Sequence, residues 1–136
     1  MREAPAEFAQ FRVAPGTRTP GEILAHIGDL MDWALTLADG APRWNDSIPL
    51  AWDQEVARFF EGMRKLDQRL ASAPVDEKTA EGLFQAPIAD ALTHVGQISM
   101  LRRLAGSPVR GESYFRATIV AGNVGPKQAA PGLEFD

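Results

Sequence analysis

The sequence predicts an all-α fold, a four-helix bundle with short or irregular segments at both ends. Three segments whose apolar residues recur at helical spacing support this prediction, together with the loop-forming residues between them. The length of 136 residues suits a single domain. Amphipathic helices joined by loops bury their apolar faces by packing into a bundle, and we expect one end of the chain to supply the fourth element.

The first helix is expected to begin at Thr19 and to end before Gly40. Thr19 and Glu22 have the spacing of a capping box, and Pro20 suits the first helical turn. A glycine at the far end is a usual helix stop. The apolar face of this helix consists of Ile23, Ile27, Leu30, Met31, Ala34, Leu35 and Ala38.

Two further helices are expected over residues 50–72 and from about Pro87 to before Gly106. The earlier one has the cleanest amphipathic pattern in the chain, with charged residues opposite its apolar face. Its apolar face consists of Val56, Phe59, Phe60, Met63, Leu66 and Leu70. That of the later helix consists of Ile88, Ala91, Leu92, Val95, Ile98, Leu101 and Leu104.

The two ends of the chain have weaker patterns. Residues 3–12 suit a short helix, whereas the pattern of residues 113–121 is compatible with either a strand or a helix. Residues 125–136 contain prolines and glycines and are expected to form a loop or an extended arm. The whole chain, residues 1–136, is thus expected to be one helical domain, with a core over about 19–105 and a tail over 125–136.

The composition argues against several classes of protein. The net charge is -4 and basic residues occur only as short pairs, so we expect no nucleic-acid binding. No run of about 18 apolar residues predicts a membrane span, and none near the start predicts a signal peptide. The chain has no cysteine, which excludes thiolate metal sites and makes the cytoplasm the expected location. Serine-nucleophile elbows and phosphate-binding glycine loops are also missing from the sequence.

The two histidines lie within predicted helices and suggest a metal site. Asp90 stands four residues before His94, a spacing that places both side chains on one face of a helix. His26 lies on another helix, at the margin of its apolar stripe, where side chains point into the seam between packed helices. An alternative interpretation makes Asp90 and His94 a surface ion pair and His26 an ordinary seam residue.

Three neighbouring residues are weaker candidates for the surroundings of such a site. Gln97, three residues after His94, is placed to orient a ligand or a bound water. Asp29, three residues after His26, is placed to bind the metal or to accept the imidazole N–H, or else belongs to a solvated acidic face. Trp33 is placed either to line a pocket or to pack in the core.

Two sequence stretches resemble the DinB-like (YfiT-like) metalloenzyme family. Residues 19–27, Thr-Pro-Gly-Glu-Ile-Leu-Ala-His-Ile, are similar to the signature of its second helix. Residues 90–97 resemble the signature of a later helix, in which a histidine is followed by x-Gly-Gln. In the family a metal-binding residue, usually histidine, stands four positions before that histidine, where this chain has Asp90.

The resemblance implies a four-helix bundle with up-up-down-down connectivity that forms a homodimer and binds a divalent metal through three side chains. His26, Asp90 and His94 would then form a set of two imidazoles and one carboxylate, which suits zinc, nickel, manganese or iron(II). Such a set leaves positions open for water and substrate. The family includes transferases that use a low-molecular-weight thiol.

Two functions follow from these observations as hypotheses. The first is a metal-dependent enzyme that activates water or a thiol, for hydrolysis or group transfer on a small molecule. The second is a non-catalytic helical dimer that binds a small ligand or a protein partner and has a degenerate metal site. The carboxylate of Asp90, in place of the usual histidine, favours the second hypothesis.

Overall fold

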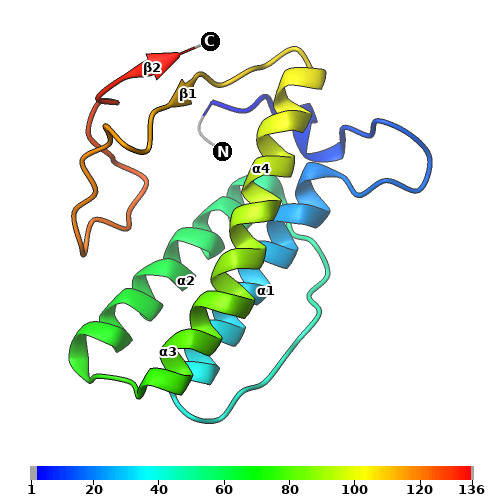
Figure 1. Ribbon diagram of the computed structural model, residues 1–136. Helices are drawn as coiled ribbons and strands as arrows, with labels where there is room; N and C mark the ends of the chain where they lie inside the picture. Colours follow the sequence, from blue (N-terminus) through cyan, green and yellow to red (C-terminus); the bar gives the residue numbers. More distant parts are fainter. Residues whose placement is uncertain (1–2, 136) are drawn as a thin grey trace.

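Three long helical rods form most of the structure, a computed structural model that describes residues 3–135 (Figure 1). The first rod is α1 (Pro20–Ala38) and the second is α2 (Trp52–Ser72). The third rod comprises α3 (Glu77–Leu83), the π-helical segment η2 (Phe84–Ile88) and α4 (Ala89–Leu104). The mainly helical part of the prediction is therefore confirmed, but within residues 3–135 neither end of the chain supplies the expected fourth helix.

The start and end of α1 agree with the sequence prediction. The Thr19 side-chain oxygen accepts a hydrogen bond from the Glu22 backbone N–H at 3.2 Å, and the Glu22 carboxylate accepts one from the Thr19 N–H at 2.6 Å. These two bonds form the capping box and satisfy donors that the helix itself leaves unpaired. At the other end Gly40 adopts a φ of 73°, which a residue with a side chain rarely adopts.

The first two rods run in the same direction, and the third returns antiparallel to them (Figure 1). Residues 39–51 therefore cross the full length of the bundle in extended form before α2 begins. We call this segment the crossover. Connections of this length without secondary structure are uncommon in compact domains and often contribute to functional sites.

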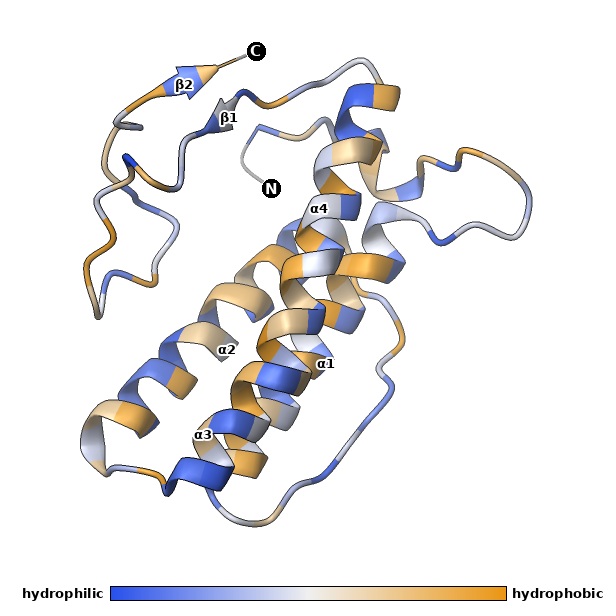
Figure 2. Cartoon of the chain, in the orientation of Figure 1, coloured by the Kyte–Doolittle hydropathy of each residue, from blue (hydrophilic) through white to orange (hydrophobic). Residues whose placement is uncertain are grey.

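The rod α1 lies between the other two rods and packs against both. Hydrophobic and hydrophilic residues alternate along the rods, as Figure 2 shows, so each has a face to bury. Leu24, Ile27 and Ala34 of α1 are fully buried at the centre. Within residues 3–135, no helix combines the length and apolar character that crossing a membrane requires.

The third rod begins ten residues earlier than predicted, so the expectation of a start near Pro87 was wrong. The helix is capped by Asp76, whose carboxylate accepts a hydrogen bond from the Thr79 N–H at 2.8 Å. Pro87 lies inside the rod, in the π-helical segment, where the Ala89 N–H bonds to the carbonyl of Phe84 five residues back. A proline disrupts an ordinary α-helix because it lacks an N–H and its ring strikes the preceding turn, and the wider π turn accommodates it.

The ends of the chain add little regular structure. The predicted N-terminal helix is present as a single 3-10 segment, η1 (Ala6–Gln10). Near the other end β1 (Gly111–Glu112) pairs with β2 (Glu134–Phe135) in an antiparallel ladder. Residues 113–121, for which the sequence left strand and helix open, form neither and are mostly exposed. Residues 125–133 form the predicted loop.

Arg58 joins α1, α2 and the crossover at one point. Its guanidinium donates to Asp29 at 2.5 Å, to Asp32 at 2.7 Å and to the Ser47 hydroxyl at 2.7 Å. The Asp29 carboxylate also accepts from the Ser47 backbone N–H at 3.0 Å and from its hydroxyl. Gly28 leaves room for the guanidinium, since a β-carbon there would lie only 3.0 Å from it. We call Arg58, Asp29, Asp32 and Ser47 the arginine hub.

Glu55 fastens the end of the crossover beside this hub. Its side chain is fully buried, and one carboxylate oxygen accepts a hydrogen bond from the Leu50 N–H at 2.9 Å. The other oxygen lies 3.6 Å from the Arg58 guanidinium and has no hydrogen-bond partner among the described residues. A buried carboxylate needs such a nearby cation, so Glu55 depends on Arg58.

Asp29→Asn is expected to lower the free energy of unfolding by about 2 kcal/mol at neutral pH, because Arg58 loses a buried carboxylate but keeps Asp32. Burial acts to raise the pKa of the Asp29 carboxyl, but hydrogen bonds from Ser47 and Arg58 outweigh it and leave that pKa below 3.8, its ordinary value. The charged form is therefore favoured by folding, and its contribution is lost as the pH falls below 3.8 through the lower folded-state pKa.

Denaturant titrations of both proteins over a range of acidic pH will test this. The stability difference between wild type and Asp29→Asn should shrink as the pH falls. Asp32→Asn serves as the control, because this side chain is 54% exposed and should contribute less than about 1 kcal/mol. A difference between wild type and Asp29→Asn that is independent of pH would contradict the expectation.

Candidate metal centre

The fold brings the three predicted ligands together. His26 comes from α1, whereas Asp90 and His94 lie one turn apart on α4. The Nε2 atom of His26 lies 3.4 Å from one Asp90 oxygen, and the Nε2 atom of His94 lies 3.4 Å from the other. One possible ligand atom from each residue can be chosen so that all three lie within 4.8 Å of one another. The two imidazole rings meet edge to face with centroids 4.7 Å apart.

These atoms lie farther apart than a charge-assisted hydrogen bond requires and close enough together to hold one cation. A charge-assisted hydrogen bond from an imidazolium to a carboxylate is typically about 2.7–2.9 Å long. Two ligand atoms that each bind one zinc ion at about 2.0–2.1 Å in tetrahedral geometry lie about 3.3 Å apart. The two observed distances of 3.4 Å run to different oxygens of Asp90, and one ligand atom from each of the three residues lies within 4.8 Å of the other two. The donor set of two nitrogens and a carboxylate therefore fits a divalent transition metal.

Gln97 orients the imidazole of His94, as its position in the sequence suggested. Its side-chain oxygen lies 2.8 Å from Nδ1 of His94. An amide oxygen can only accept, so Nδ1 carries the hydrogen and Nε2 presents its lone pair to Asp90 and His26. His94 is nearly buried, which restricts the ring further. This is the usual arrangement by which a second hydrogen bond fixes a metal-binding histidine.

The crossover supplies an aromatic wall that the sequence analysis did not identify. Trp44 packs edge to face against His26 with ring centroids 5.5 Å apart, and its indole N–H donates to Asp46 at 3.1 Å. The rings of Trp33 and Trp44 have centroids 5.7 Å apart, and Trp33 also packs against the core cluster that includes Leu30 and Met31. Trp33 therefore supports Trp44, which is the residue that contacts His26. A tryptophan in a long polar loop is the one sequence feature that could have indicated this contact.

Asp29, a weaker candidate from sequence, does not join the three residues. Both of its oxygens accept hydrogen bonds from Ser47, and one also accepts from Arg58. Its side chain is only 4% exposed and serves the arginine hub. The interpretation as a solvated acidic face also fails, because the burial is nearly complete. Asp29 influences the site indirectly, by anchoring the crossover that carries Trp44.

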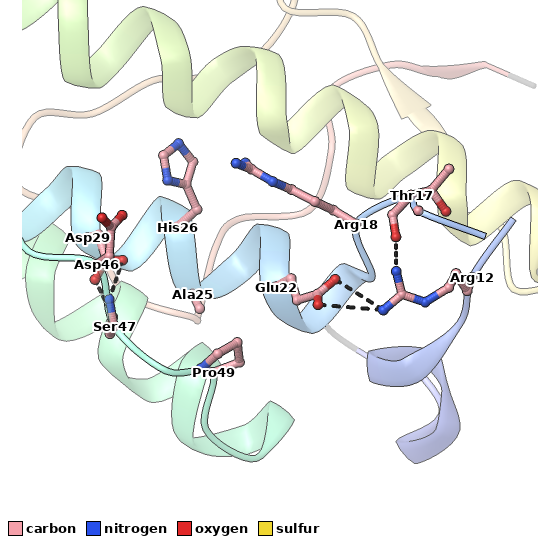
Figure 3. Close-up of a pocket in the computed structure, with 11 residues that line it drawn as sticks. Arg12, Thr17, Arg18, Glu22, Ala25, His26, Asp29, Asp46, Ser47 and Pro49 are labelled. Carbon is pink, nitrogen blue, oxygen red and sulfur yellow. Dashed lines mark hydrogen bonds and ion pairs between the residues drawn. The ribbon is translucent and has the colours of Figure 1, made fainter. Parts of the chain in front are cut away.

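An open pocket adjoins His26 on the side of the chain start (Figure 3). It has a volume of about 330 Å³ and is lined mainly by polar side chains of α1, of the crossover and of the segment before α1. Arg12 binds Glu22 at 3.4 Å and donates to the Thr17 carbonyl. Arg18 extends toward His26 in the same view. Asp90 is half exposed, so solvent reaches the candidate ligands as well.

Comparison of the chain with protein-family models, with curated proteins and with solved structures gives no match. The geometry of the side chains is the basis for any assignment of the site.

Gln97→Leu is expected to weaken zinc binding about tenfold, because His94 loses the acceptor that fixes its tautomer and ring orientation. Gln97→Glu should retain most of the affinity, since it keeps an acceptor oxygen in the same position. Competition titrations with a zinc-sensitive dye would measure both constants. The thermal midpoint without metal should be similar in all three proteins, and equal affinities for the leucine and glutamate variants would refute a role for the Gln97 oxygen.

Proposed function

We propose that this protein is a divalent-metal-dependent enzyme that activates water or a thiol for hydrolysis or group transfer on a small molecule. The proposal depends mainly on one observation: His26, Asp90 and His94, from two different helices, each offer one ligand atom, and these atoms lie within 4.8 Å of one another. A divalent metal at such a point supplies Lewis acidity, which activates a nucleophile or polarises a substrate oxygen.

The roles of the residues follow from their contacts. His26 and His94 provide neutral nitrogen donors, and Asp90 provides the single negative charge of the set. Gln97 holds the proton of His94 on Nδ1 and so keeps Nε2 free for the metal. The half-exposed carboxylate of Asp90 leaves one side of the set open to solvent and substrate. Trp44 covers His26 and restricts its rotation.

We propose further that the chain is DinB-like in its connectivity. The parallel order of α1 and α2, the long crossover and the antiparallel return of the third rod support an up-up-down-down arrangement. The groove between α2 and α4 is lined mainly by apolar residues, has a volume of about 380 Å³ and offers an apolar surface against which a fourth helix would pack. A homodimer in which a partner subunit covers this groove belongs to the same proposal.

The apolar groove also favours a second candidate function, that of a non-catalytic binding module. Its lining includes Met31, Phe59, Met63 and Val95, and the last of these is exposed. Exposed apolar surface of this kind binds small apolar ligands or a protein partner. In that case Asp90 and His94 would be a structural pair and the protein would take up no metal.

Metal uptake distinguishes the two functions. Protein prepared without a histidine tag, incubated with zinc and then desalted, should retain close to one equivalent by plasma mass spectrometry, because a formed site fills above its Kd. Asp90→Asn should lose most of this metal, since it removes the only charged ligand. Glu81→Gln is the matched control, as it removes an exposed carboxylate from the same rod.

Less than about 0.2 equivalents in the wild type, with zinc, nickel, manganese and iron(II) each tried, would reject the metal-dependent function. Equal metal content in Asp90→Asn and Glu81→Gln would reject this particular ligand set.

Bound zinc is expected to raise the thermal midpoint by several degrees, because it binds the folded chain only. The increase should diminish in mildly acidic buffer, since protons compete with the metal for His26 and His94. Differential scanning fluorimetry with and without zinc at several pH values measures both effects. The midpoint of His94→Ala should not respond to zinc at any pH, and a full response in that variant would contradict the assignment.

A further inference from the structure

Arg18 lies beside the candidate metal centre, in a segment whose backbone is held by the start of α1. It directly precedes Thr19, the buried N-cap of α1, which is 3% exposed. Figure 3 shows its side chain extending toward the imidazole of His26, on the side of α1 that faces α4. Both Arg18 and His26 line the same pocket.

Of the two arginines that line this pocket, Arg12 is paired with another described residue and Arg18 is not. Arg12 is engaged by Glu22 and by the Thr17 carbonyl. Arg18 forms neither a hydrogen bond nor an ion pair with any part of residues 3–135. A free guanidinium offers a planar fork of donors that matches the two oxygens of a carboxylate or the oxygens of a phosphate.

Two of the three acidic residues that line the pocket are already paired with other arginines. Glu22 is paired with Arg12, and Asp29 is paired with Arg58. Asp46 accepts a hydrogen bond from the indole of Trp44 and is the one acidic lining residue without a paired cation among those described. A divalent cation held with a single carboxylate would add a further positive charge. The electrostatic balance next to His26 then favours an anion.

We propose that Arg18 binds an oxyanion, a carboxylate or a phosphate, carried by the small molecule on which the metal centre acts. The inference that this molecule is the substrate of a metal-dependent enzyme rests on the proposed function. The oxyanion site itself rests on Arg18 and its pocket. Arg18 then determines specificity: it holds the charged end of the ligand while another group of the ligand reaches His26, Asp90 and His94.

Isothermal titration calorimetry on the full chain, loaded with zinc and desalted, would test this. Malonate and inorganic phosphate are the charged probes, and malonamide is the uncharged analogue of malonate. Arg18→Gln should weaken binding of the preferred anion at least about tenfold, because a charge-assisted fork is lost. Arg12→Gln removes the same charge from the same pocket but from a paired arginine, so its effect should stay below about threefold.

Zinc content measured on each variant separates this proposal from the metal function. Normal zinc content with weakened anion binding in Arg18→Gln supports the oxyanion site, and the tighter of the two anions identifies the class. Equal effects of the two arginine variants, or no anion binding by the wild type, would overturn it. If the wild type holds no metal, the metal-dependent function fails. The oxyanion site then still stands if the metal-free chain binds the anion and Arg18→Gln weakens that binding. If the metal-free chain binds no anion, both proposals are overturned.

Discussion

The ion pair between Arg58 and Asp29 is the interaction on which the arrangement of this protein depends. Two parallel helices cannot be joined by a short turn, so the chain must return along the whole bundle before the second one starts (Figure 1). That return segment has no helix or strand to satisfy its backbone. Arg58 and Asp29 hold it through Ser47, and Glu55 holds its end through Leu50.

This dependence links stability to the candidate metal centre. The crossover carries Trp44 against His26, so the position of the aromatic wall follows from the contacts that Asp29 and Arg58 make about one helical turn further along α1. A buried pair of charges stabilises a fold little compared with an apolar pair of the same size, but it admits one geometry. The arginine hub therefore contributes more to the placement of the crossover than to the total free energy of folding.

The sequence predicted those parts of the structure that rest on local rules. The capping box at Thr19, the glycine stop and the four-residue spacing of Asp90 and His94 are local patterns, and each was found in place. The third rod starts earlier than predicted because Asp76 caps the helix and the π-helical segment accommodates Pro87 inside the rod. The roles of Arg58 and Trp44 depend on contacts between segments distant in sequence, which no periodicity reveals. Residues 113–121 are mostly exposed, so core packing does not select one conformation for them.

The π-helical segment has a consequence for how the third rod tolerates changes in length. An α-helix turns by about 100° per residue, so η2 in effect contains one residue more than a regular helix would use. That extra residue lets Leu83 pack in the cluster of Ala34, Ala38 and Leu66, while Ala91 and Ile98 pack in the cluster around Leu24 and Ile27. Deleting a single amino acid between 84 and 88 would restore a regular helix but rotate one half against the other. Either Leu83 would then lose its core contacts, or Asp90 and His94 would no longer point toward His26.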